Sequence, residues 1–181
     1  MNNVALGIVA GLCLLALPRY IVCPFHNVIF NDLLLMLNTT LKIYIYSLDT
    51  ASKPCPYYVQ DFLNTTYYVF NLTTEDKCQP NTRTLSAELG NDTEAGEPYM
   101  DIQNWAGNKT LRKLLRYYND QEKCGVVWYK QNGTSHFELH VRVDKFLIMD
   151  GKKVFSNCLS VYRAFISQLN SLTLECTPGC H

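Results

Sequence analysis

Residues 111–143 read LRKLLRYYNDQEKCGVVWYKQNGTSHFELHVRV, and this stretch decides the fold class. It contains three runs rich in β-branched and aromatic residues, at 111–118, 123–130 and 135–143. Two polar segments, NDQE at 119–122 and QNGT at 131–134, separate the runs and are typical of turns. The stretch therefore predicts three consecutive strands of an antiparallel meander.

The same pattern continues on both sides of this stretch. Four further strands are predicted upstream, at residues 41–47, 57–62, 65–73 and 82–89. A short helix is predicted at 28–38, an acidic loop with two glycines at 90–98, and an amphipathic helix at 154–172, where apolar residues recur at steps of three or four. A meander of about seven or eight strands usually closes, because closure removes its edges. Eight strands leave an interior wide enough for one small ligand.

The composition excludes several classes of partner. The chain of 181 residues is 48% hydrophobic and 18% charged, which is typical of one globular domain. Sixteen basic and sixteen acidic side chains cancel, so neither nucleic acid nor a membrane is expected as a partner. The sequence has no Walker loop, nucleophile elbow or zinc-protease helix motif, so we expect neither an enzyme nor a cofactor. We expect a monomer.

The N-terminus predicts a secreted protein. Residues 4–17 are almost wholly apolar and end at Pro18 and Arg19, which makes the run shorter than the roughly 20 residues of a membrane-spanning helix. We expect a signal peptide at 1–23 and a mature domain at 24–181. A membrane anchor over residues 4–22 is the alternative.

Glycosylation sequons are also typical of secretion. There are six, about three times the number expected by chance, although an Asn- and Thr-rich chain can carry some by coincidence. Their asparagines are Asn38, Asn64, Asn71, Asn91, Asn108 and Asn132.

The cysteines predict disulfide bonds. Cys13 and Cys23 fall within the predicted leader, which leaves an even number, as a disulfide framework requires. The remaining cysteines are Cys55, Cys78, Cys124, Cys158, Cys176 and Cys180. Spacing alone does not choose among their pairings.

Several motifs from residue 115 onward resemble those of the tick salivary lipocalins, the family that includes the tick histamine-binding proteins. They are LRYYND at 115–120, KCGVV at 123–127, FELHV at 137–141, NC at 157–158 and ECTPGC at 175–180. The N-terminal half is similar through Asp32, the strand at 41–47 and Cys55.

The resemblance implies a fold and a set of disulfides. The fold is mainly β: an eight-stranded antiparallel barrel, with a short N-terminal helix and a C-terminal helix packed outside. The implied disulfides are Cys124–Cys158 and Cys55–Cys176, and Cys78 and Cys180 remain for a third bond. The implied function is a secreted salivary lipocalin that sequesters a host small-molecule inflammatory mediator.

The strand at 135–143 carries the candidate ligand site. One face holds Phe137, Leu139, Val141 and Val143, and the other holds His136, Glu138, His140 and Arg142. Alternation alone favours a solvated polar face. The resemblance implies instead that this polar face points into the barrel, because the family's glutamate at the position of Glu138 binds ligand. The expected ligand-binding residues are Glu138, His140, Arg142, Tyr44, Tyr46 and Trp128. A metal site at His136, Glu138 and His140 is a weak alternative, and we expect no metal.

The ligand class stays open between a biogenic amine, such as histamine or serotonin, and an eicosanoid-type lipid. Amine-binding members of the family carry several buried carboxylates, and this chain has Gly125 and Leu115 at two of those positions and Leu34 in place of a tryptophan. Glu138 remains for an amine, whereas a lipid would pair with Arg142 or His140.

A second class of function is a protein-binding inhibitor of complement or haemostasis with a filled barrel. A cavity of roughly 300 Å³ or more favours the carrier. A closed lumen with an exposed apolar patch favours the inhibitor.

Overall fold

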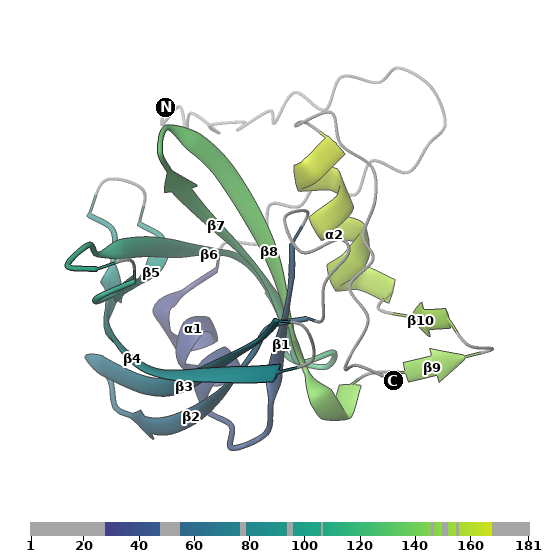
Figure 1. Ribbon diagram of the computed structural model, residues 1–181. Helices are drawn as coiled ribbons and strands as arrows, with labels where there is room; N and C mark the ends of the chain where they lie inside the picture. The colour runs from purple at the N-terminus through teal and green to yellow at the C-terminus, as the bar shows by residue number, and fades with distance from the viewer. Residues whose placement is uncertain are drawn as a thin grey trace, which may run out of the picture.

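Eight antiparallel strands pair in sequence order, and β8 pairs back onto β1 to close a barrel (Figure 1). The structure is a computed structural model that describes residues 28–47, 55–76, 79–93, 96–105, 107–145, 147–149, 152–154 and 156–167. The barrel strands are β1 (Ile43–Ser47), β2 (Tyr57–Leu63), β3 (Tyr67–Asp76), β4 (Gln79–Asn91), β5 (Pro98–Ile102), β6 (Leu111–Asn119), β7 (Cys124–Gln131) and β8 (Thr134–Arg142). This architecture confirms the predicted fold class.

The remaining elements lie before and after the barrel in the sequence. Helix α1 (Phe30–Leu37) precedes β1, and α2 (Ser156–Ser167) follows a 3-10 turn, η2 (Val143–Lys145), and a small hairpin of β9 (Leu147–Met149) and β10 (Lys152–Val154). In Figure 1, α1 lies within the ring of strands, whereas α2 lies outside it beside β8. Both helices were predicted, but the β9–β10 hairpin was not.

Strand β5 was also missed by the sequence analysis, which assigned residues 90–98 to a loop and no element to residues 99–110. β5 is short and begins at Pro98, so its sequence carries little strand signal. Tertiary packing stabilises it: Met100 and Ile102 point into the barrel and are 3% and 2% exposed, and the strand pairs with both β4 and β6.

Alternation along the strands separates an inner cluster from an outer one. The inner cluster contains Ile43, Ile45, Tyr58, Tyr68, Phe70, Leu72, Leu85, Ala87, Leu89, Met100, Ile102, Leu115, Tyr118 and Val127 from the strands, and Leu33, Met36 and Leu37 from α1. α1 therefore fills part of the barrel interior.

α1 has a local capping interaction and a close contact with the sheet. The Asp32 carboxylate accepts a hydrogen bond from the backbone N–H of Ile29 just before the helix begins. A Cβ at Gly125 would lie 2.6 Å from Met36 Sδ, so the missing side chain at Gly125 allows the helix to approach β7.

The outer cluster lies between α2 and the strands. It contains Tyr46, Cys55, Cys124, Val126, Leu139, Val141, Cys158, Val161, Tyr162 and Ile166. Because α2 covers the outer face of β8, both faces of that strand are buried along much of its length.

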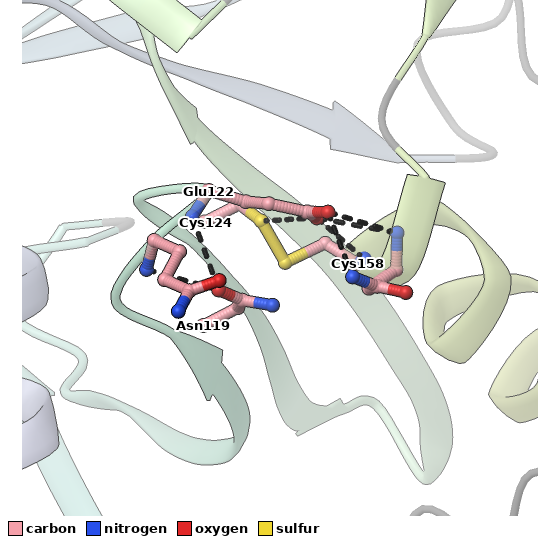
Figure 2. The surroundings of a disulfide bond; sticks show 6 residues. Asn119, Glu122, Cys124 and Cys158 are labelled. Carbon is pink, nitrogen blue, oxygen red and sulfur yellow. Dashed lines mark hydrogen bonds between the residues drawn. A yellow bond between two sulfur atoms is a disulfide. The ribbon is translucent and has the colours of Figure 1, made fainter.

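Two interactions hold the start of α2 against the barrel (Figure 2). Cys124 of β7 and Cys158 of α2 form a disulfide with a Cα–Cα distance of 6.2 Å, which confirms this predicted pair. The Glu122 carboxylate, in the β6–β7 turn, accepts hydrogen bonds from the backbone N–H groups of Asn157 and Cys158 over 3.2 Å, and from Asn157 Nδ2 over 2.9 Å. An acidic side chain from another part of the chain thus satisfies donors that the first turn of a helix leaves without partners.

Several sequence predictions fall outside the described residues. Cys55 is disulfide-bonded, but its expected partner Cys176 and the expected Cys78–Cys180 pair lie outside the described residues, as does the predicted leader at 1–23. Within the described parts of the chain, no helix is both long enough and apolar enough to cross a membrane. Five sequon asparagines, Asn38, Asn64, Asn91, Asn108 and Asn132, are exposed, and Asn71 is half-buried. Glycosylation stays a prediction.

Replacing Glu122 by alanine should loosen α2. We expect Glu122→Ala to lower the free energy of unfolding by about 1 kcal/mol, the typical loss when a helix N-terminus loses its capping side chain, with a fall in Tm of roughly 2–4 °C. Thermal unfolding measures the effect, and Glu88→Ala, at an exposed position on β4, is the matched control. Equal stability of the two variants would show that the Glu122 contact contributes nothing.

Candidate functional site

A chain of polar side chains crosses the otherwise apolar barrel interior. The Lys113 ammonium on β6 donates to Glu138 Oε2 on β8 over 2.6 Å, and the same oxygen lies 2.8 Å from His140 Nε2. The other ring nitrogen of His140, Nδ1, lies 3.0 Å from the hydroxyl of Tyr58 on β2. Lys113, Glu138 and His140 are 2%, 5% and 1% exposed, so these connected polar side chains are shielded from bulk water.

Two aromatic rings complete the surroundings of the Lys113 ammonium. Nζ lies 4.7 Å from the ring centroid of Trp105, in the β5–β6 turn, and 4.8 Å from that of Tyr129 on β7. Both distances suit an attraction between a cation and the face of an aromatic ring. Lys113 therefore has one carboxylate and two aromatic partners inside the barrel.

Strand alternation explains how charged residues come to face inward. On β6, Leu111, Lys113 and Leu115 share the inner face and are all buried, whereas Arg112 points outward and pairs with Asp101. On β8, Glu138 and His140 alternate with Leu139 and Val141, which pack in the outer cluster beneath α2.

The hydrogen bonds and the burial together indicate the protonation states of Glu138, His140 and Tyr58. Burial by itself raises the pKa of Glu138, but the Lys113 ammonium and the contact with His140 outweigh it and hold that pKa below its usual range. An ionised carboxylate only accepts, so His140 carries its proton on Nε2 and donates it to Glu138. Nδ1 then accepts from Tyr58, whose pKa burial raises well above its usual value. Burial, assisted by Lys113, lowers the pKa of His140 and keeps its ring neutral, although Glu138 acts in the opposite direction.

Four of the six residues predicted to bind ligand lie outside the barrel interior. Tyr44, Tyr46 and Trp128 were expected to line the cavity, but their side chains point outward. Tyr44 and Tyr46 alternate with the inward residues Ile43 and Ile45, and Trp128 follows the inward Val127 and pairs with Phe137 of the outer layer. Tyr44 and Tyr46 pack in the outer layer next to α2, because Ile43 and Ile45 occupy the inner face of β1.

Trp128 and Arg142 are occupied by other contacts. The outward ring of Trp128 lies 4.9 Å from the guanidinium carbon of Arg116. Arg142, the last residue of β8, forms two hydrogen bonds to Asp144 at 2.6 and 2.9 Å and does not line the cavity. Glu138 and His140 are the predicted residues that the structure places inside the barrel.

The structure adds four residues that the sequence analysis missed: Lys113, Tyr58, Trp105 and Tyr129. Lys113 had a detectable signal, because it alternates with two leucines on a strand. Its inward position follows once Leu111 and Leu115 face the core.

The weak alternative of a metal site does not match this geometry. His136 stacks on Tyr129 with ring centroids 4.9 Å apart, while Glu138 and His140 bond to Lys113 and Tyr58. Among the described residues, the group that could offer three metal ligands is Glu122, Cys124 and Cys158, whose two sulfur atoms are joined to each other.

The lumen is nearly filled by the chain's own side chains. A cavity of about 10 Å³, close to the space for one water molecule, lies among these side chains. Tyr58, Tyr68, Phe70 and Trp105 form its aromatic walls, and Lys113 and His140 are its charged and polar members. The Tyr68 hydroxyl, which is buried, has no hydrogen-bond partner among the described residues. A larger ligand must displace side chains to enter.

At Gly125 the chain lacks one of the buried carboxylates that amine-binding tick salivary lipocalins carry. A side chain there would collide with Met36 of α1 and would lie 3.2 Å from a Leu115 methyl group. An aspartate could occupy this position only if the Met36 side chain moved.

Comparisons with known proteins give only distant likenesses, and these are to solved structures. No family model matches the sequence, and no curated protein matches it either. Among solved structures, the chain is similar to Ex-FABP, a siderocalin that functions through dual ligand specificities, with a TM-score of 0.43 and 10% sequence identity over 78% of this chain and 91% of that one. The barrel is assigned from its own strand pairing, since a likeness this distant adds nothing to it.

The neutral, buried His140 predicts a loss of stability on mild acidification. An unfolded histidine takes up a proton near pH 6.5, whereas folded His140 resists it, so below that pH the unfolded state binds more protons. Between pH 7 and 5.5 this site should reduce the free energy of unfolding by up to about 1.4 kcal/mol per pH unit, the limit for one proton.

Denaturant unfolding at several pH values measures this dependence. His140→Phe should be less stable at neutral pH but should show a shallower decline with acid. His136→Phe, on the same strand, should retain the decline of the wild type. An unchanged pH slope in His140→Phe would contradict the assignment of a neutral His140.

Proposed function

We propose that this chain is a binding protein that takes a small molecule inside its barrel, at the site formed by Lys113, Glu138, His140 and Tyr58. The observation that carries the proposal is the ion pair of Lys113 and Glu138 within an apolar lumen. Buried ion pairs are weak sources of stability, and apolar residues of similar volume often replace them without loss. A barrel whose interior served only as a core would have no need of these charges.

The resemblance to the tick salivary lipocalins supports a more specific role. On that basis the chain is secreted after removal of residues 1–23, carries glycans and acts as a monomer. It sequesters a host inflammatory mediator, either a biogenic amine such as histamine or serotonin, or an eicosanoid-type lipid, and so suppresses host defence. The role is one of binding rather than catalysis.

Each ligand class has one partner inside the barrel. An amine would bind the Glu138 carboxylate, and an acidic lipid would bind the Lys113 ammonium, which replaces Arg142 as the candidate cation. Either ligand must break the contact of 2.6 Å between these two groups, because each is the other's charge partner.

The small cavity favours a second candidate function. With a free volume of about 10 Å³, the barrel resembles the filled scaffold expected of a protein-binding inhibitor of complement or haemostasis. Such an inhibitor would use surface residues, among which Ile29 just before α1, Leu35 on α1, Phe62 on β2 and Tyr67 on β3 are large, apolar and exposed.

Calorimetry with histamine, serotonin and a leukotriene tests the proposal. We expect micromolar or tighter binding of one ligand to the secreted protein. Amine binding should disappear in Glu138→Gln, lipid binding should disappear in Lys113→Met, and Glu88→Gln should bind as the wild type does. Absence of binding across the panel, together with a stable complex with a complement or clotting factor, would establish the second function in place of the first.

A further inference from the structure

We propose that the first N-acetylglucosamine of a glycan on Asn64 packs against the exposed ring of Phe62, so that this sugar becomes part of the β2–β3 hairpin. The contact rests on the secretion and glycosylation that belong to the proposed function, but it is independent of any ligand inside the barrel. It distinguishes Asn64 from the other five sequon asparagines, whose glycans would extend into solvent.

Phe62 and Asn64 lie on the outer face of the β2–β3 hairpin. Leu63 and Tyr68 are directly opposite each other and pack against the inner cluster, so the residues on either side of Leu63 point away from the barrel. Phe62 is 50% exposed, and Asn64 is exposed as well. Side chains two residues apart on a strand lie roughly 7 Å from each other, a distance that one sugar ring attached to Asn64 can span.

The turn between β2 and β3 fixes the Asn64 amide in an orientation that suits glycosylation. Its Oδ1 accepts hydrogen bonds from the backbone N–H groups of Thr66 and Tyr67, over 2.8 and 2.7 Å, and from the Thr66 hydroxyl over 3.2 Å. None of these bonds uses Nδ2, the atom that carries an N-glycan. Oligosaccharyl transfer replaces one Nδ2 proton by a bond to C1 of the sugar and releases the lipid diphosphate that carried the oligosaccharide. All three hydrogen bonds of the turn can therefore persist in the glycosylated chain.

Phe62 offers an apolar surface that complements the first sugar. A β-linked N-acetylglucosamine has one apolar face, formed by the C–H groups at C1, C3 and C5, and the electron-rich face of an aromatic ring attracts such groups. Tyr67, which accepts a backbone hydrogen bond from Asn64 across the turn, is 37% exposed and extends this surface. A sugar stacked on Phe62 would shield apolar area that the barrel leaves in water, which is favourable.

Asn132 provides a matched comparison, because it also lies in a tight turn between paired strands. Its sequon joins β7 to β8, and its side chain is exposed. The residue two positions before it is Lys130, which has no ring. At Asn91 the corresponding residue is Leu89, which is 7% exposed and packs in the inner cluster. Neither asparagine has an exposed aromatic ring two positions before it, so neither glycan should stabilise the barrel as that of Asn64 does.

A cycle of four variants measures the contact: the wild type, Phe62→Thr, Asn64→Asp and the double variant. Each is secreted as the full chain with high-mannose glycans and trimmed by endoglycosidase H to one N-acetylglucosamine at every occupied site. Asn64→Asp removes the sugar but keeps an acceptor oxygen for the turn. Phe62→Thr should lower Tm by roughly 2–4 °C more when Asn64 carries its sugar than in Asn64→Asp, as expected for the loss of one aromatic contact.

Two controls accompany the cycle. When Asn132→Asp replaces Asn64→Asp, the effects of the two substitutions on Tm should add to within about 1 °C. Peptide mass mapping of the secreted wild type should find Asn64 occupied.

NMR gives a readout that does not depend on stability. Nuclear Overhauser effects should connect the Phe62 ring protons to the hydrogens at C1, C3 or C5 of the sugar on Asn64. The ring should also shift these sugar hydrogens upfield, and both signals should vanish in Phe62→Thr.

An unmodified Asn64 in the secreted protein would overturn the contact, as would strictly additive losses of Tm or the absence of these Overhauser effects. A protein partner that binds through Phe62 equally well with and without the sugar would overturn it too, since the ring would then serve the second candidate function. Calorimetry with the ligand panel is a separate outcome: its failure would count against the proposed carrier and would leave the sugar contact standing.

Discussion

The Glu138 carboxylate is a negative charge held inside an apolar barrel, and the arrangement of the interior depends on how that charge is neutralised. Lys113 supplies the opposite charge at 2.6 Å, and His140 donates a hydrogen bond to the same oxygen at 2.8 Å. Lys113 and His140 each make further contacts inside the barrel. Lys113 requires Trp105 and Tyr129 around its ammonium, and His140 requires the Tyr58 hydroxyl at its second nitrogen. Because Lys113, Glu138, His140 and Tyr58 are buried, removing one of them leaves another without its polar partner.

The strand pattern made the barrel predictable from sequence, but the number of strands and their first and last residues were less certain. The polar turns at 119–122 and 131–134 lie between strands β6, β7 and β8 as expected, and the two helices were located to within a few residues of their observed starts. β5 escaped detection because Pro98–Ile102 depends on its neighbours for stability rather than on its own propensities. The β9–β10 hairpin escaped because each of its strands has only three residues, and Val154 was assigned to the helix that follows.

The inward or outward direction of side chains was harder to predict, and the reason is physical. When both faces of a strand are buried, alternation no longer tells the lumen from the exterior. On β1 the sequence IYIYS offers two apolar faces: the isoleucines took the lumen, and the tyrosines took the layer under α2. On β8 the resemblance to a known family, rather than the pattern, gave the inward direction of Glu138 and His140. Lys113 was missed because an isolated lysine on a strand is usually solvated.

A double-mutant cycle between Lys113 and Glu138 tests most directly the claim that this ion pair organises the interior. Chemical denaturation would give the free energies of unfolding of the wild type, Lys113→Met, Glu138→Gln and the double variant. The structure predicts that each single substitution costs about 3–5 kcal/mol, because it leaves a buried charge without its partner, and that the double variant recovers a large part of that loss. Strictly additive losses, with a coupling energy below about 0.5 kcal/mol, would show that the two groups do not depend on each other and would contradict the account.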